Sequence, residues 1–321
     1  MTAVLSVLRR IDRSVFILAA AIVLLLVGGS FYMSEFLTVH YLLQQLHVAT
    51  FLGIVATGAM VVILLGHIDL SVPWVLTVSA MMATSISSLG GWASAFAIPS
   101  GLAVGVLIGL INGLMVAYMR VPSMIITLGV NAVLLGLAVL YTGGFAPQTK
   151  ASEVMLLLGQ KRSFIGIPNM VYVWIVVAAA VVFMLRRTPL GRHIYAIGNR
   201  ERATYLSGVN TRRVLIICFM IAGFCSALGG VMLSGYVNQS YQAMGDPYLL
   251  PAIAAVVLGG TNILGGRGTY LGTIGGVLVI TLLQSMLSVM QMQESGRQII
   301  YGAVIIAMLL LHGRSGKLAS A

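Results

Sequence analysis

The segment RRTPLGRHIYAIGNRERATYLSGVNTRR, residues 186–213, decides the fold class of this chain. It carries seven arginines and one acidic residue, Glu201, and it separates two apolar runs near 170–185 and 214–236. Both runs approach the roughly 17–25 residues that a helix needs to cross a bilayer. The sequence therefore predicts a membrane protein that holds a basic, structured segment outside the lipid, where a partner can bind it.

The composition of the chain indicates the same environment. Of the 321 residues, 59% are hydrophobic and 8% are charged, whereas soluble domains carry about 25% charged residues. The net charge of +11 does not indicate nucleic-acid binding, because the arginines are not interleaved with aromatic residues on a soluble face. Dispersed methionines and two cysteines in one apolar run, Cys218 and Cys225, indicate packing rather than a metal path or redox chemistry.

The apolar runs predict an all-α membrane protein, a polytopic helical bundle of about ten transmembrane helices with cytoplasmic N- and C-termini. The ten runs lie near residues 14–34, 48–66, 72–89, 93–117, 122–141, 170–185, 214–236, 249–264, 270–289 and 297–312. The runs at 72–89 and 249–264 are the weakest, so eight spans with two re-entrant hairpins is the alternative.

The positions of the basic residues support this topology. With ten alternating spans, every lysine and arginine lies in the cytoplasm except Lys150, Lys161, Arg162 and Arg297, as the positive-inside rule requires. The whole chain, 1–321, is then one transmembrane domain with a cytoplasmic loop at 186–213. It contains no phosphate-binding lysine motif, so any ATP chemistry belongs to another chain.

The middle of the basic loop predicts a short helix. Asn199 is a suitable N-cap, Glu201 falls in the first turn, where the helix dipole favours an anion, and Gly208 can end the helix in a left-handed conformation. Ala203 and Leu206 share one face of this helix. The alternative is a basic loop that only binds anionic membrane lipids, but such a loop needs no helix caps, so a docking helix is favoured.

Four stretches of the chain follow one another in a characteristic order. They are IDLSV at 68–72, PS at 122–123 with ITLG at 126–129, GRHIYAIG at 191–198 with LSGV at 206–209, and AIAAVVLGGT at 252–261 with GGRG at 265–268. Together they resemble the permease subunit of ribose-type ABC sugar importers, in the branched-chain amino acid/ribose permease superfamily. The chain departs from that pattern at Pro73, Asn199, Arg200, Leu249 and Pro251, which leaves the substrate and the cognate ATPase open.

The resemblance implies a function and a set of partners. The protein would be a multi-pass subunit that moves a sugar or sugar-like solute across the bacterial cytoplasmic (inner) membrane. It would pair with a second permease subunit, as a homodimer or a related heterodimer. An ABC ATPase subunit or tandem ATPase would lie below, and a periplasmic or extracellular sugar-binding protein above.

This chain would be no enzyme and would hold no cofactor or metal, since ATP and Mg would bind to the partner ATPase. The resemblance also implies that 199–208 is the coupling helix that docks on that ATPase. The residues expected to serve this coupling are Gly191, Arg192, Gly198, Asn199, Glu201, Ala203, Leu206 and Gly208.

Candidates for the translocation path or gate are polar residues and glycines within or beside the apolar runs. They are Asp69, Ser71, Asn112, Asn131, Gly259, Gly260, Thr261, Asn262 and Gln284. Asp69 is favoured as a cap for a helix that starts near Ser71, over a proton or cation site.

The glycines after residue 258 are favoured as a tight reversal between spans, with a flexible gate as the alternative. An amide inside an apolar run can hold two helices together or line a solute path, and the sequence favours neither.

Two other classes of membrane protein remain as rivals. An ion-coupled secondary transporter would carry charged groups at the bilayer midplane, often within inverted repeats, and neither is evident. A passive channel or structural subunit would have no nucleotide-dependent partner. Within the favoured class, the solute could instead be a branched-chain amino acid, a nucleoside or a furanosyl signal.

Overall fold

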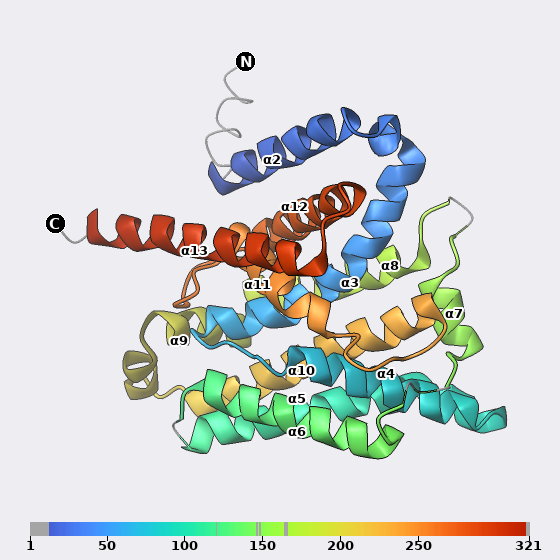
Figure 1. Cartoon of the computed structure of the whole chain (residues 1–321). Helices are drawn as coiled ribbons and strands as arrows, with labels where there is room; N and C mark the ends of the chain where they lie inside the picture. The colour runs from blue at the N-terminus through green and yellow to red at the C-terminus, as the bar shows by residue number, and fades with distance from the viewer. Residues whose placement is uncertain (1–12, 120, 146, 148, 164–165, 319–321) are drawn as a thin grey trace.

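The structure is a computed structural model that describes residues 13–119, 121–145, 147, 149–163 and 166–318 (Figure 1). Within these residues the regular elements are helices, accompanied by two isolated β-bridges. The helices are α2 Arg13–Ser30, η1 Ser34–Leu37, α3 Val39–Leu64, α4 Val72–Ser88, η2 Gly91–Phe96, α5 Ala97–Met119, α6 Ser123–Thr142, α7 Glu153–Gly159, α8 Asn169–Arg187, α9 Pro189–Leu206, α10 Thr211–Val237, η3 Asp246–Tyr248, α11 Leu249–Leu258, α12 Tyr270–Val289 and α13 Glu294–Leu318.

The expectation of an all-α polytopic protein is confirmed, but the expectation of about ten spanning helices is wrong. Six helices in the described part of the chain are long and apolar enough to cross a membrane. They are α3, the unit Gly91–Met119 that joins η2 to α5, α6, α8, α10 and α12.

Three of the four other expected spans are short apolar helices in the described residues, and the fourth, α13, is described only in part. Helix α4 follows almost the whole run at 72–89 but has only 17 residues, and α11 has 10 because the backbone after Leu258 is no longer helical. The described apolar part of α2, Leu18–Ser30, is also short. In α13 the side chains from residue 307 onward lie outside the described set, as does the basic N-terminal stretch 1–12.

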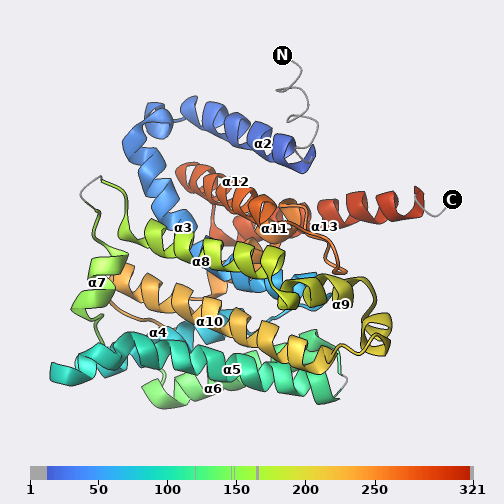
Figure 2. The ribbon, with the colours of Figure 1, turned by 180° about the vertical axis from the view of Figure 1, so that it is seen from behind.

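Helix α3 lies at the centre of the bundle, with α8, α10, α11 and α12 around it (Figures 1 and 2). Of its most apolar window, 89% is buried, whereas α6 and α8 each bury 28%. Because all three helices are similarly apolar, the outward faces of α6 and α8 are available to lipid or to another subunit.

Helices α5 and α10 approach each other closely through small residues. Gly105, Gly109 and Gly113 lie one turn apart on α5 and face the α10 backbone around Phe219 and Gly223. A Cβ atom at any of the three glycines would overlap that backbone. Small residues at this spacing allow dispersion contacts and backbone proximity to hold two membrane helices together.

Non-helical backbone enters the bundle at two places. Residues 66–71 lead into α4, where the Ile68 and Leu70 amides donate to the hydroxyls of Ser123 and Thr127 over 3.2 and 2.9 Å. Residues 239–245 lead towards α11, where the Gly245 amide donates to Thr77 Oγ1 over 3.1 Å. Side-chain hydroxyls thus replace the hydrogen bonds that a continuous helix would have made, as a water-poor interior requires.

Candidate functional site

The arginine-rich segment forms two helical pieces rather than one. Helix α9 begins at Pro189, with Thr188 as its N-cap accepting from the Gly191 amide over 3.3 Å. The helix breaks at Arg200, whose φ of −157° and ψ of 94° are extended. The pieces are therefore 189–199 and 201–206, and the second piece is the short helix predicted from the sequence, with a different start.

The prediction that Asn199 caps this short helix is wrong. Asn199 ends the first helical piece, and its Nδ2 donates to the carbonyl oxygens of Tyr195 and Gly266 over 3.0 and 3.4 Å. The prediction for Gly208 is confirmed, because its φ of 86° is left-handed and its amide donates to the Tyr205 carbonyl over 3.0 Å. The local sequence does not show that the carbonyl of Gly266, which lies on a loop distant in sequence, accepts a hydrogen bond from the Asn199 side chain.

The short helix 201–206 stands at the edge of the bundle, beyond the body of α9 (Figures 1 and 2). Leu206 is 79% exposed and Tyr205 is 65% exposed, and Glu201 and Ala203 are exposed beside them. Large exposed apolar side chains on a charged helix are typical of a surface that another protein covers.

The first piece of α9 is fixed to the loop between α11 and α12. Tyr195 Oη donates to the Gly268 carbonyl over 3.0 Å, next to the Asn199 contact with Gly266. Gly198 lies so close to the Leu64 carbonyl and to Gly266 that no Cβ atom fits there. The Gly266 amide in turn donates to Leu64 over 2.9 Å, so α9, α3 and this loop form one tightly packed unit.

Gly191 and Arg192 lie at the start of α9, close to the end of α8. Gly191 is buried against the carbonyls of Met184 and Leu185, which leaves no room for a Cβ atom. Arg192 is exposed. These positions support the α8–α9 corner, whereas the exposed apolar side chains of this segment lie after Arg200.

A cavity of about 560 Å³ separates the short helix from the membrane body. Its lining includes His67, Pro122, Glu201, Arg202 and Arg212. Burial lowers the pKa of His67, and the charge of Glu201 opposes that shift. Glu201, Arg202 and Tyr205 of the short helix face this space, whereas Thr204 is buried.

Three of the path candidates form one hydrogen-bonded cluster. Asp69 Oδ1 accepts from the Ser71 amide over 2.9 Å and from the Ser71 hydroxyl over 2.6 Å, and Asn112 Nδ2 donates to Ser71 Oγ over 2.8 Å. All three residues are buried. The N-cap position of α4 is Ser71 itself, so Asp69 stabilises the turn that precedes α4 instead of occupying the cap position.

The glycines after α11 form a compact reversal. Gly259 packs against Gly272 without room for a Cβ atom, and Gly260 has a left-handed φ of 86°. The Asn262 amide donates to the Arg267 carbonyl over 2.8 Å. Thr261 is buried, and its hydroxyl has no hydrogen-bond partner among the described residues. Close packing accounts for the glycines.

The remaining two candidates lie apart from that cluster. On α6, the Asn131 side-chain oxygen is buried without a partner among the described residues. Gln284 lines a pocket of about 300 Å³ between α3, α12 and α13. The pocket lies near the C-terminal end of α12, whereas the N-terminal end, at Tyr270, lies on the side of the arginine-rich segment.

Sequence reasoning missed the other polar residues of that pocket. Gln45, Thr281, Ser285, Ser288 and Tyr301 also line it. A signal was present on α12, because residues 281, 284, 285 and 288 are polar and recur at helical spacing within an apolar run. The contributions of α3 and α13 had no such signal, since they come from distant parts of the chain.

Comparison with known proteins identifies the family. Residues 41–309 match the family described as branched-chain amino acid transport system / permease component. The chain is 34% identical to the ribose import permease protein RbsC of Haemophilus influenzae over 292 residues, 90% of each chain. It is 33% identical to RbsC of Bacillus subtilis over 259 residues, 81% of this chain and 80% of the relative.

A third relative is named for a different solute. The chain is 30% identical to the autoinducer 2 import system permease protein LsrC of Escherichia coli over 296 residues, 92% of this chain and 85% of the relative. No solved structure matches the chain. The predicted resemblance to ribose-type importers and the multi-pass location in the bacterial cytoplasmic membrane are confirmed. The chain belongs to the permease-component family of branched-chain amino acid transport systems.

Proposed function

We propose that this chain is the membrane-spanning subunit of an ATP-driven ABC importer for a sugar or a sugar-like solute. The names of its relatives support this class, since two import ribose and one imports autoinducer 2. Two such subunits would pair in the membrane, a soluble sugar-binding protein would deliver the solute, and a separate ATPase would bind ATP and Mg. This chain would catalyse no reaction.

One observation supports the coupling role: the exposed helix 201–206 follows directly after the tightly packed helical piece 189–199. The exposed apolar side chains of Tyr205 and Leu206 suit a groove on the ATPase, flanked by arginines that keep the segment out of the lipid. The preceding piece, 189–199, is held to the 265–268 loop at Tyr195, Gly198 and Asn199. A displacement of the helix would therefore reach that loop through these close contacts.

The loop at 265–268 offers a route from the docking helix into the membrane. It connects α11 to α12, and α11 follows the non-helical segment that contacts α4 at Pro73 and Thr77. On this proposal, closure of the ATPases moves 201–206, then the loop with Gly259–Asn262, and then the ends of α11 and α4.

The residues beside that route are proposed as its polar lining. Asp69, Ser71 and Asn112 fix the start of α4 and would set the inner boundary of the path, while Asn131 and Gln284 would offer hydrogen bonds to solute.

The coupling role is tested by charge changes on the docking helix in the complete transporter. Leu206→Asp and Glu201→Lys should reduce uptake of radiolabelled D-ribose to background and prevent co-purification of the ATPase, because an apolar and a charge contact are lost from the docking face. The variant subunits should still reach the membrane in normal amounts. Leu89→Asp is the matched control, since Leu89 is 72% exposed at the opposite end of the bundle. Normal uptake by both docking-helix variants rejects the coupling role.

The energy source and the solute class are tested separately. Collapse of the proton gradient, with cellular ATP maintained, should leave uptake intact, whereas an ion-coupled transporter would stop. Competition by D-ribose and by L-leucine then separates the solute of the named relatives from that of the family description. Competition by leucine alone would overturn the sugar assignment and leave the coupling role standing.

A further inference from the structure

The pocket between α3, α12 and α13 is a second polar region, away from the arginine-rich end. Its volume is about 300 Å³, which is at the lower end of the roughly 300–1,000 Å³ that small-molecule pockets occupy. Helix α12 contributes Thr281, Gln284, Ser285 and Ser288 from one face, and Ser288 at the mouth is exposed. A polar stripe on an apolar membrane helix is costly unless it meets a partner.

Two hydroxyl groups of the pocket lining are buried and weakly partnered. Thr281 is 2% exposed and Tyr301 is 1% exposed. Neither hydroxyl makes a well-formed hydrogen bond within the described residues, although Tyr301 lies towards the amide of Gln284. A threonine inside a helix commonly bonds the carbonyl one turn before it, but Thr281 does not. The Thr281 hydroxyl is therefore without a partner among the described residues, and the Tyr301 hydroxyl faces a Gln284 amide that a bound molecule can replace.

Other polar groups of the pocket are already organised. Ser285 Oγ and Tyr41 Oη share a hydrogen bond of 2.6 Å, which fixes the α12 stripe against α3. Gln45 of α3 and Tyr301 of α13 also line the pocket. Its donors and acceptors therefore come from three helices. Such convergent polar groups determine the orientation of a bound small molecule.

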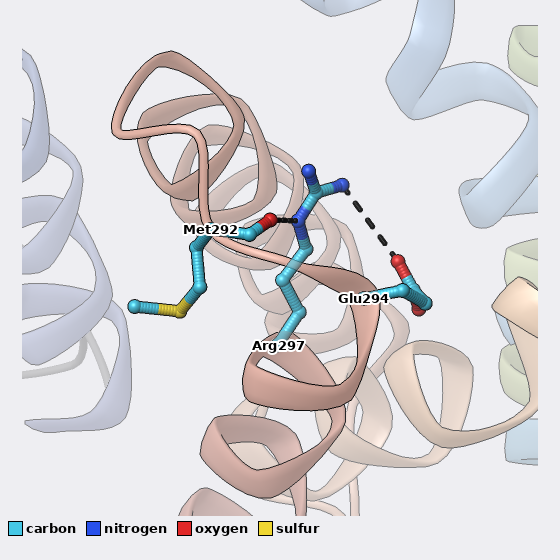
Figure 3. A network of polar contacts seen from close by, with 3 residues as sticks. All are labelled: Met292, Glu294 and Arg297. Atoms are coloured by element: carbon cyan, nitrogen blue, oxygen red, sulfur yellow. Dashed lines mark hydrogen bonds and ion pairs between the residues drawn. The ribbon is translucent and has the colours of Figure 1, made fainter.

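The charges at the start of α13 compensate each other. Arg297 Nη1 lies 3.7 Å from Glu294 Oε2, and Arg297 Nε donates to the Met292 carbonyl over 3.0 Å (Figure 3). An anionic or cationic ligand would have to displace this pair and lose its own hydration. The pocket therefore favours a neutral ligand that both donates and accepts hydrogen bonds.

From these observations we infer that the pocket is a binding subsite for a neutral polyhydroxylated solute, of the size of a monosaccharide. Thr281 and Tyr301 bond the solute hydroxyls, and Gln45 and Gln284 provide further donors and acceptors. The subsite lies at the far end of α12 from the docking helix, on the side where the solute would enter. This inference rests on the proposed importer function and adds the residues that contact its solute.

The test is protection of a cysteine at the mouth of the pocket. Ser288→Cys is introduced into the full chain in nanodiscs and labelled with a maleimide, while Cys218 and Cys225 are buried and do not compete. D-ribose, D-xylose, D-glucose and L-leucine are the probes, and the concentration that halves the labelling rate is measured. We expect at least one sugar to protect. Adding Thr281→Val or Tyr301→Phe should raise the required concentration by about fivefold, the effect of one lost neutral hydrogen bond.

Thr50→Val is the matched control for these variants. It removes a buried hydroxyl that bonds the His47 carbonyl over 2.6 Å outside the pocket, so protection should not change. Protection by leucine and not by sugars overturns the polyhydroxylated solute class. Labelling that no sugar slows, or sugar protection unaffected by both pocket variants, overturns the subsite. Because this readout needs no ATPase, loss of the coupling role in uptake assays is a separate outcome.

Discussion

The two ends of this bundle are packed in different ways. At the arginine-rich end, backbone packs directly on backbone: Gly198 contacts Leu64 and Gly266, and Gly259 contacts Gly272. At the other end, α3, α12 and α13 line a pocket in which the Thr281 hydroxyl has no hydrogen-bond partner among the described residues. Close-packed backbone transmits displacement, and an unfilled polar pocket accommodates a molecule. On the proposed function, force transfer and solute contact would belong to different ends.

The largest expected effect comes from adding one carbon atom at the packed end. Gly198→Ala should abolish uptake and lower the unfolding free energy by about 1–3 kcal/mol, because the new Cβ overlaps Leu64 and Gly266. Thermal denaturation of the purified subunit and an uptake assay measure both. Gly136→Ala on α6 is the control, since its Cβ meets open space and the change should be neutral or slightly stabilising. Equal behaviour of the two variants would show that the packed unit transmits nothing.

A smaller effect is expected from the cluster at the start of α4. Asn112→Leu removes the hydrogen bond to Ser71 Oγ and should lower the unfolding free energy by about 1 kcal/mol. Uptake should fall in proportion to the amount of folded subunit, which immunoblots of membranes can follow. A complete loss of uptake at normal subunit levels would instead make Asn112 a direct solute contact, and the contrast between the two ends would be weaker.

The smallest effect is expected at Asp69. Asp69→Asn keeps a side-chain oxygen that can accept from the Ser71 amide and hydroxyl, so uptake should remain near normal. Measurement of ATP-driven uptake in energised vesicles decides the matter. If this neutral variant abolishes uptake while the subunit stays folded, Asp69 acts through its charge, and the ion-coupled alternative gains support.

The sequence predicted the class of fold and named several residues that the structure brings together. Hydropathy identified a helical membrane protein, and the four motifs identified its family. Asp69, Ser71 and Asn112 were chosen separately and do lie together. Gly208 ends its helix as predicted, because a left-handed position there favours glycine whatever the tertiary contacts.

Features that depend on tertiary contacts were not predictable in this way. An apolar run indicates that a segment is buried but does not determine whether its helix is long enough to cross a membrane. The short helices α4 and α11 were therefore counted as full spans. Asn199 has the chemistry of an N-cap, but the carbonyls of Tyr195 and Gly266 take its amide nitrogen. Tyr301 and Thr281 line the same pocket because α13 packs against α11, which no local pattern reveals.

The central claim is that the short helix 201–206 faces the cytoplasm and docks on an ATPase. The most direct measurement is labelling of Leu206→Cys by a membrane-impermeant maleimide in inverted and right-side-out vesicles, each prepared with and without the ATPase. The account predicts labelling only in inverted vesicles, and strong protection when the ATPase is present. Labelling in right-side-out vesicles, or labelling in inverted vesicles that the ATPase does not slow, would contradict it.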